Sequence, residues 1–172
     1  MRLHMVDGTR LLIDLKAAGL LKAMAHSPTL RVVPEPFGLD LEGDRAAVNV
    51  QIRAEAIELP DDMSDGDRAR MRDNLRGAEV LDARRWPTIE FRGRYDGTDQ
   101  GGTLAGALVL RGAQASVAMP VRVQRQWDVL AAEASWEGPL TRLGIRPFKA
   151  LLGAIKLEDW IRLRVEARFR EG

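Results

Sequence analysis

The chain has 172 residues, 45% of them hydrophobic and 30% charged, and its 26 basic and 25 acidic side chains nearly cancel to a formal net charge of +1. The length suits a single domain over residues 1–172, and the charge balance argues against a dedicated nucleic-acid-binding protein, which carries a basic excess. The absence of cysteine excludes disulfides, thiolate nucleophiles and cysteine-ligated metal ions.

Nothing in the sequence has the length and apolar character of a membrane-spanning segment. The first ten residues, MRLHMVDGTR, also lack the apolar core and the small-residue cleavage site of a secretory signal. We therefore expect a cytoplasmic protein, or a periplasmic one if a leader has been removed. Transient contact with a membrane and formation of a homodimer stay open.

Most of the hydrophobic pattern has a period of two residues, which predicts half-buried β-strands. The clearest example is residues 48–56, where Val48, Val50 and Ile52 alternate with polar side chains. The other predicted strands, in chain order, are residues 11–15, 89–95, 104–110, 117–123, 131–137 and 160–169.

Short turns separate these strands, among them residues 97–102 and 111–113. Strands that follow one another through short loops are antiparallel neighbours in a sheet. Seven or eight such strands predict an all-β fold with short helices, either a sandwich or a closed barrel.

Three short helices are predicted between the strands. One begins after Ser64, because Asp67 stands three residues further on as in a capping box, and it ends at Gly77. The other two cover residues 17–25 and 147–152, the latter with Gly153 after its end.

The sequence contains no known catalytic motif. Its two histidines, His4 and His26, do not form a zinc-binding pair, and the serine elbow and the phosphate-binding loops are missing. We therefore predict no enzymatic activity, no metal and no cofactor. Two alternatives stay open: an enzyme that uses His26 on a small apolar substrate, and a filled barrel that serves as an interaction module.

Residues 72–91, RDNLRGAEVLDARRWPTIEF, resemble the signature of the YceI family, in which Tyr-Pro or Trp-Pro precedes Thr-Ile-x-Phe. Residues 106–123, GALVLRGAQASVAMPVRV, and LGIRPF at 143–148 are similar to the motifs that follow in that family. The resemblance implies a bacterial, eight-stranded antiparallel lipocalin-like barrel that binds and transports a polyisoprenoid chain or an isoprenoid quinone. Asn74 stands where a histidine is common in the family.

The inward faces of the predicted strands mix large and small apolar side chains, and the small ones leave room for a slender chain. An isoprenoid lipid in this space gains about 0.8 kcal/mol for each methylene removed from water. The predicted ligand-binding residues are Leu21, Met24, Phe37, Val50, Ile52, Ile89, Phe91, Leu108, Met119, Val121, Trp136, Leu143, Phe148, Leu152, Leu163 and Val165.

Residues 143–152 are predicted to form a lid that gates one end of the barrel. The candidate contacts to a ligand head group are His26, Arg142, Arg146 and Lys149. An apolar inner face is equally typical of a filled barrel core, so the residues by themselves leave the choice between a hollow and a filled barrel open.

Overall fold

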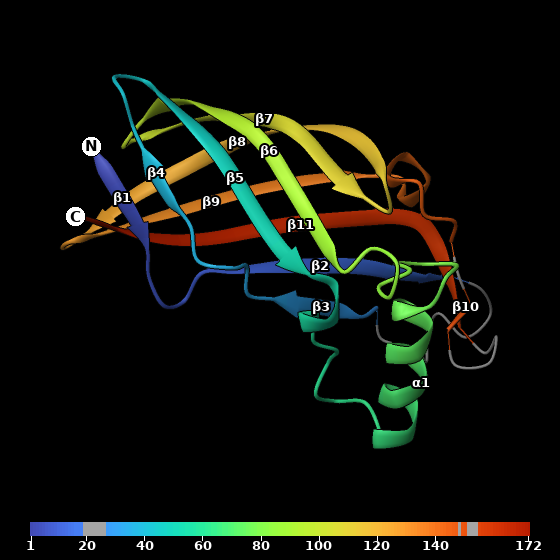
Figure 1. Ribbon diagram of the computed structural model, residues 1–172. Helices are drawn as coiled ribbons and strands as arrows, with labels where there is room; N and C mark the ends of the chain where they lie inside the picture. Colours follow the sequence, from blue (N-terminus) through green and yellow to red (C-terminus); the bar gives the residue numbers. More distant parts are fainter. Residues whose placement is uncertain (19–26, 148, 151–154) are drawn as a thin grey trace.

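The computed structural model describes residues 1–18, 27–147, 149–150 and 155–172. Figure 1 shows a strongly curled sheet with a helix, α1 (Asp65–Arg76), at one end and both chain termini at the other. Two 3₁₀ turns, η1 (Ala54–Ala56) and η2 (Leu140–Leu143), accompany the sheet. The strands are β1 (Arg2–Met5), β2 (Arg10–Ala18), β3 (Thr29–Val32), β4 (Gly38–Asp40), β5 (Arg45–Arg53), β6 (Thr88–Thr98), β7 (Gly101–Leu110), β8 (Ala113–Gln126), β9 (Val129–Gly138), β10 (Lys149–Ala150) and β11 (Ile155–Glu171).

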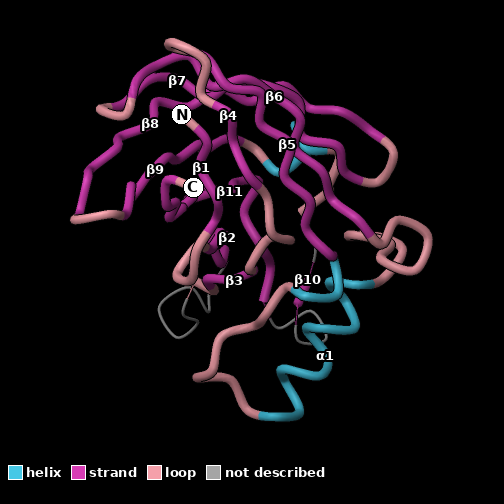
Figure 2. Tube along the Cα trace, turned by 60° about the vertical axis from the view of Figure 1, so that its left-hand side comes forward, coloured by secondary structure: helices cyan, strands magenta, loops and turns pink. Residues whose placement is uncertain are grey.

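The main path of the sheet runs β3-β2-β11-β9-β8-β7-β6-β5, and every pairing along it is antiparallel. The chain that follows β5 bridges to the other edge strand, β3, and so closes the curled sheet, which Figure 2 shows from a second side. Arg31 and Glu58 exchange two backbone hydrogen bonds of 3.0 and 2.7 Å across the seam, and the Glu35 N–H donates to the Gln51 carbonyl at 2.9 Å. The predicted eight-stranded antiparallel lipocalin-like barrel is confirmed.

The alternation read from the sequence determines which side chains enter the barrel. Along β5, Val48 and Ile52 are buried, while Asn49 and Gln51 between them are exposed. The register from Arg45 opposite Asp96 to Arg53 opposite Thr88 is unbroken, so β6 places Phe91 and Tyr95 on the same inner face. The predicted strands are therefore present, and their pairing places the alternate apolar side chains on one inner face of the barrel.

A pair of glycines lets β6 and β7 approach closely where the barrel wall curves. Gly93 lies directly opposite Gly106, and a Cβ atom on Gly106 would stand 2.5 Å from the Gly93 Cα atom. A Cβ atom on Gly93 would stand 2.6 Å from the Phe91 ring. The missing side chains thus allow the sheet to bend and allow the Phe91 ring to lie across its own strand.

Helix α1 begins as predicted, because the Ser64 hydroxyl accepts a hydrogen bond of 3.2 Å from the Asp67 backbone N–H. Met71 and Leu75, four residues apart, are its buried side chains. The predicted end of the helix at Gly77 is confirmed. Gly77 has φ −68° and ψ 165°, and its N–H donates to the Asn74 carbonyl, so any L-residue could adopt this backbone.

The predicted strand 48–56 begins and ends three residues later than β5, which covers Arg45–Arg53. Arg53 pairs with Thr88, the first residue of β6, and the residue before Thr88 is Pro87, which has no N–H for the ladder. The Ala54 N–H donates instead to the Pro87 carbonyl, and η1 turns the chain out of the sheet.

The two other predicted helices are wrong where the structure describes them. Lys149 and Ala150 are extended and pair with Lys156 and Ile155 as β10 against β11. Ala17 and Ala18 continue β2 as a strand, because they pair with Leu157 and Lys156. Residues 19–26, 148 and 151–154 lie outside the described residues.

The barrel interior is filled at one end only. At the end covered by α1, Leu15, Leu30 and Val32 of the sheet pack with Met71 and Leu75 of the helix and with Leu140 and Leu143 of η2. We call this cluster the plugged end. A smaller cluster of Leu3, Leu130, Ala167 and Phe169 lies near the termini, and we call that end of the barrel the hollow end.

Candidate functional site

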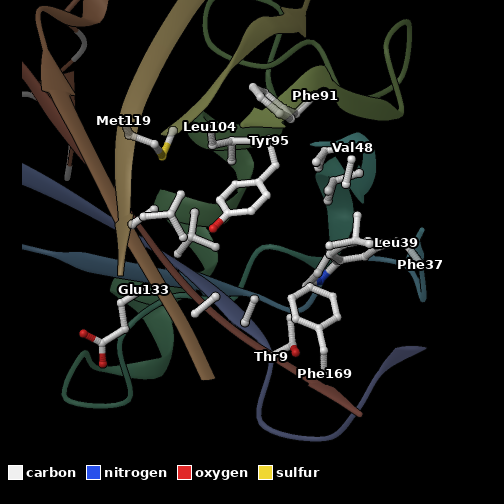
Figure 3. A pocket seen from close by; sticks show the side chains of 18 of the residues that line it. Thr9, Phe37, Leu39, Val48, Phe91, Tyr95, Leu104, Met119, Glu133 and Phe169 are labelled. Carbon is white, nitrogen blue, oxygen red and sulfur yellow. The ribbon is translucent and has the colours of Figure 1, made fainter. Parts of the chain in front are cut away.

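An apolar cavity of about 180 Å³ lies in the hollow end of the barrel and extends to the plugged end. Figure 3 shows Phe91, Leu104 and Met119 pointing into it from neighbouring strands, with Phe169 on the opposite wall. Ile52, Leu108 and Leu163 border the cavity and also contact the plugged end, so they form its floor. The interior of the barrel is therefore divided along its length.

The inward side chains differ in accessibility, although some cavity-lining residues, such as Met119 and Phe169, are as buried as those of the plugged end. At the plugged end Leu30 and Leu140 are only 1% and 2% exposed. Around the cavity Phe91, Leu104 and Val121 point inward along the same alternation but remain partly accessible. These side chains lack neighbours on one side because they border empty space, and packing contacts are lost there.

The cavity wall contains few polar groups, and most of those are already satisfied. The Thr9 hydroxyl donates to backbone carbonyl oxygen and accepts a 2.9 Å hydrogen bond from the Arg168 N–H. The Glu133 carboxylate is directed away from the apolar side chains in Figure 3. Arg10 is exposed and forms an ion pair of 2.6 Å with Glu166. A charged substrate has no partner deep inside this cavity.

Tyr95 is the polar side chain that extends furthest among the apolar ones in Figure 3. Its hydroxyl donates a 2.6 Å hydrogen bond to the Thr98 carbonyl, at the start of the β6–β7 turn. Burial, and to a smaller extent the Asp99 carboxylate, raise the pKa of Tyr95 above its ordinary value. The phenol is therefore neutral at physiological pH and can only accept a further hydrogen bond.

The structure places many of the predicted ligand-binding residues on the cavity wall. These are Phe37, Val50, Ile52, Phe91, Leu108, Met119, Val121, Leu163 and Val165. Ile89, Trp136 and Leu143 belong instead to the plugged end, where they pack against buried side chains. Leu21, Met24, Phe148 and Leu152 lie outside the described residues, as does His26.

The predicted lid does not border the cavity in its described part. Leu143 and Ile145 are 4% and 5% exposed and fill the plugged end. Arg142 and Arg146 are exposed at that same end, and the Arg142 guanidinium donates to the Ser116 carbonyl and lies 5.9 Å from the Trp136 ring. The backbone of Lys149 belongs to β10. The candidate head-group cations that are described are thus far from the hollow end.

Several wall residues were absent from the predicted set. Leu104, Ala132 and Phe169 continue alternations that the sequence already revealed, so the same pattern could have selected them. Leu3 and Leu39 could not be found in this way, because β1 and β4 have four and three residues and are too short to show a period.

The described part of the chain contains no group of three histidine, aspartate or glutamate side chains placed to hold a metal ion. It also contains no helix long and apolar enough to cross a membrane. The ion pairs lie mostly on the outer face of the barrel, as does that of Asp14 with Arg164 at 2.7 Å.

An eight-stranded antiparallel barrel around an apolar cavity defines a class of ligand-binding protein. This chain belongs to the YceI-like family, because the family model of the YceI-like domain matches residues 26–169. The resemblance that began at residues 72–91 is thereby confirmed.

Two solved structures with the same fold are similar to this chain. BcnA of Burkholderia cenocepacia shares 12% identity at a TM-score of 0.69, with 93% of this chain and 95% of BcnA covered. The YCEI protein of Campylobacter jejuni shares 14% identity at a TM-score of 0.54, with 90% of this chain and 98% of that protein covered. No curated protein matches the chain. These neighbours show that the chain shares its fold with other YceI-type proteins.

Proposed function

We propose that the protein binds one isoprenoid lipid, a polyprenyl chain or an isoprenoid quinone, in the cavity and carries or buffers it without catalysis. The observation that carries the proposal is the empty apolar space in a barrel whose other end is densely filled. Natural interiors are close-packed, and a void of this size that serves no ligand would cost stability.

The chemistry of the wall selects the class of ligand. Leucine, valine, methionine and phenylalanine side chains contact whatever enters, and the Thr9 hydroxyl already has backbone partners. Burial of hydrocarbon supplies the binding free energy, at about 0.8 kcal/mol for each methylene. The isoprenoid class, as opposed to a straight acyl chain, is supported by the sequence resemblance to YceI proteins.

The size of the cavity limits how much of the lipid is buried. An engineered cavity of about 150 Å³ in another protein holds one benzene ring. At about 180 Å³, this cavity holds a group of similar size, such as the end of a prenyl chain. A longer chain extends toward the hollow end, because Ile52 and Leu163 close the floor.

A series of prenyl alcohols with one to four isoprene units tests the proposal. The purified protein is titrated with each alcohol and the bound mass is followed by native mass spectrometry. We expect one ligand per chain and an affinity that rises over the first units and then levels off, because the added units stay outside the cavity. Straight-chain alcohols with the same carbon numbers serve as controls and should bind more weakly. Equal binding of both series would contradict the isoprenoid assignment, and no binding of either would contradict the proposal as a whole.

A further inference from the structure

One tryptophan at the hollow end has no packing role within the protein. Trp127 is 96% exposed, whereas Trp86 is 36% exposed. The other three tryptophans each have a cation near the ring: Arg85 at Trp86, Arg142 at Trp136, and both Lys16 and Arg162 at Trp160. Among the described residues Trp127 has no such partner.

The backbone conformation at Trp127 is also unfavourable for a tryptophan. Gln126 pairs with Val129, so Trp127 and Asp128 form a two-residue turn between β8 and β9. Trp127 has φ 58°, the left-handed region that such turns normally fill with glycine or asparagine. A bulky aromatic residue there is unfavourable for the fold. Neither its exposure nor its conformation stabilises the barrel.

Two exposed ion pairs connect the turn to neighbouring elements of the barrel. The Asp128 carboxylate accepts from the Arg170 guanidinium at 2.7 Å, which ties the turn to the end of β11. Arg125, two residues before Trp127, reaches Asp99 at 3.3 Å in the β6–β7 turn. Asp99 and its exposed neighbour Thr98 both belong to the cavity wall, so the cavity reaches the surface beside this turn.

Several of the charges at this end of the barrel form ion pairs. Besides the Arg125 and Arg170 pairs, Arg2 at the same end bonds to Asp40 at 2.9 Å. Met1, 44% exposed, is another apolar side chain at this end. A projecting indole beside paired arginines is suited to the interface of a lipid bilayer, where tryptophan places its ring at the level of the head groups.

We propose that Trp127 is a membrane-docking residue that brings the hollow end of the barrel onto a lipid bilayer, so that the ligand passes between the bilayer and the cavity. The inference rests on the proposed function, because a protein that binds a poorly soluble lipid must collect it from a membrane. The surface recognised is a neutral, zwitterionic bilayer. Paired arginines leave little net positive charge to attract anionic lipids.

The test compares the wild-type protein with Trp127→Gly, using Trp86→Phe as the matched control at the plugged end. Glycine suits the turn, so thermal melting should show that Trp127→Gly is folded and at least as stable as the wild type. Each protein is mixed with phosphatidylcholine vesicles whose acyl chains are brominated near the head group, and quenching of tryptophan fluorescence is measured. Co-sedimentation gives the fraction bound.

We expect the wild type and Trp86→Phe to be quenched and to bind alike, and Trp127→Gly to bind at least about tenfold more weakly, since one indole no longer leaves water. Raising the salt concentration to about 0.5 M should change wild-type binding by less than about twofold, because the docking contact is the apolar indole and not a charge. Unchanged vesicle binding by Trp127→Gly would overturn the inference. Conversion of a wild-type dimer to a monomer by Trp127→Gly would also overturn it, because Trp127 would then be a contact between two copies.

A second readout separates this inference from the proposed function. Prenyl alcohol is supplied either from ethanol, free of vesicles, or from preloaded vesicles. We expect Trp127→Gly to take up the ethanol-delivered ligand like the wild type and to extract the vesicle-bound ligand more slowly. Equal extraction rates with normal uptake would refute only the docking role. Failure of the wild type to take up ligand from either source would refute the proposed function itself.

Discussion

The plugged end and the hollow end of this barrel are made from the same strands, yet one is solid and the other contains a cavity. At the plugged end, side chains from outside the sheet enter the barrel, notably Met71 and Leu75 of α1 and Leu140 of η2. At the hollow end the short strands β1 and β4 supply Leu3 and Leu39, which stay at the wall. The alternating apolar residues of the strands therefore form the inner face of the barrel. The segments between the strands determine whether the space inside is filled.

Residue size reinforces this difference. The inner face near the cavity contains Ala132 and Ala134 on β9, and Gly93 faces Gly106 where β6 and β7 bend. At the plugged end the residue farther along β9 is Trp136, which packs against the filled cluster. A single strand thus changes from small to large inward side chains over a few residues, and this change coincides with the floor of the cavity.

Truncation of large side chains should have the largest effect on the free energy of unfolding. The size of this effect should differ strongly between the two ends of the barrel. Leu140→Ala leaves a void in close-packed surroundings and should lower the free energy of unfolding by about 2–5 kcal/mol. The matched change Leu104→Ala removes a side chain that already borders empty space, and we expect a cost of about 1 kcal/mol or less. Urea unfolding of both variants measures the difference. Equal costs at the two ends would mean that the barrel is filled uniformly.

Enlargement of small side chains should have the next largest effect. Ala54→Trp overpacks the plugged end, where Ala54 is 1% exposed, and should destabilise the protein by about 1–3 kcal/mol or more. Ala134→Trp instead fills the cavity, so the fold should survive while prenyl binding is lost. Thermal melting and ligand titration of the two variants provide the check. Normal binding by a folded Ala134→Trp protein would show that the ligand lies elsewhere.

The smallest effect should come from an ion pair on the outer face, which belongs to neither end. Two hydrogen bonds of 2.7 and 2.8 Å from Arg164 hold the pKa of the Asp14 carboxyl below its ordinary value. Because the folded state prefers the carboxylate, this contribution is present above the unfolded pKa of about 3.9 and is lost as the pH falls through the lower folded pKa. Asp14→Asn should cost about 1 kcal/mol at about pH 7 and progressively less below about pH 4.

Unfolding measured across this pH range checks the sign as well as the size of the effect. A cost for Asp14→Asn that stays constant down to about pH 2 would mean that the carboxylate charge contributes nothing. A cost as large as that of Leu140→Ala would mean that the outer ion pairs, and not the filling of the interior, dominate stability.

The sequence predicted those parts of the molecule that repeat a pattern over many residues. Alternation revealed the long strands, and Ser64 with Asp67 revealed the start of α1. Strand β5 ends at Arg53 because Pro87 precedes the first residue of its partner strand β6. No pattern within residues 48–56 encodes that contact. Strands as short as β4, from Gly38 to Asp40, show no period of their own.

The candidate site was predictable in composition but not in position. Inward residues such as Phe91 and Val165 follow from alternation and do line the cavity. Leu143 and Ile145 formed an apolar group that is equally suitable for a lid or for a plug, and only the packing of η2 against the sheet decides between them. The volume left empty depends on how α1 and η2 enter the barrel, which is a property of the whole fold.

The central claim is that the space bounded by Phe91, Leu104 and Phe169 holds an isoprenoid lipid. The most direct measurement is mass spectrometry of an organic-solvent extract from protein purified without detergent, with the Ala134→Trp variant treated identically. We expect a prenyl lipid or an isoprenoid quinone in about equimolar amount from the wild type and none from the variant. An empty extract from folded wild-type protein that also fails to take up added prenyl lipid would contradict this claim.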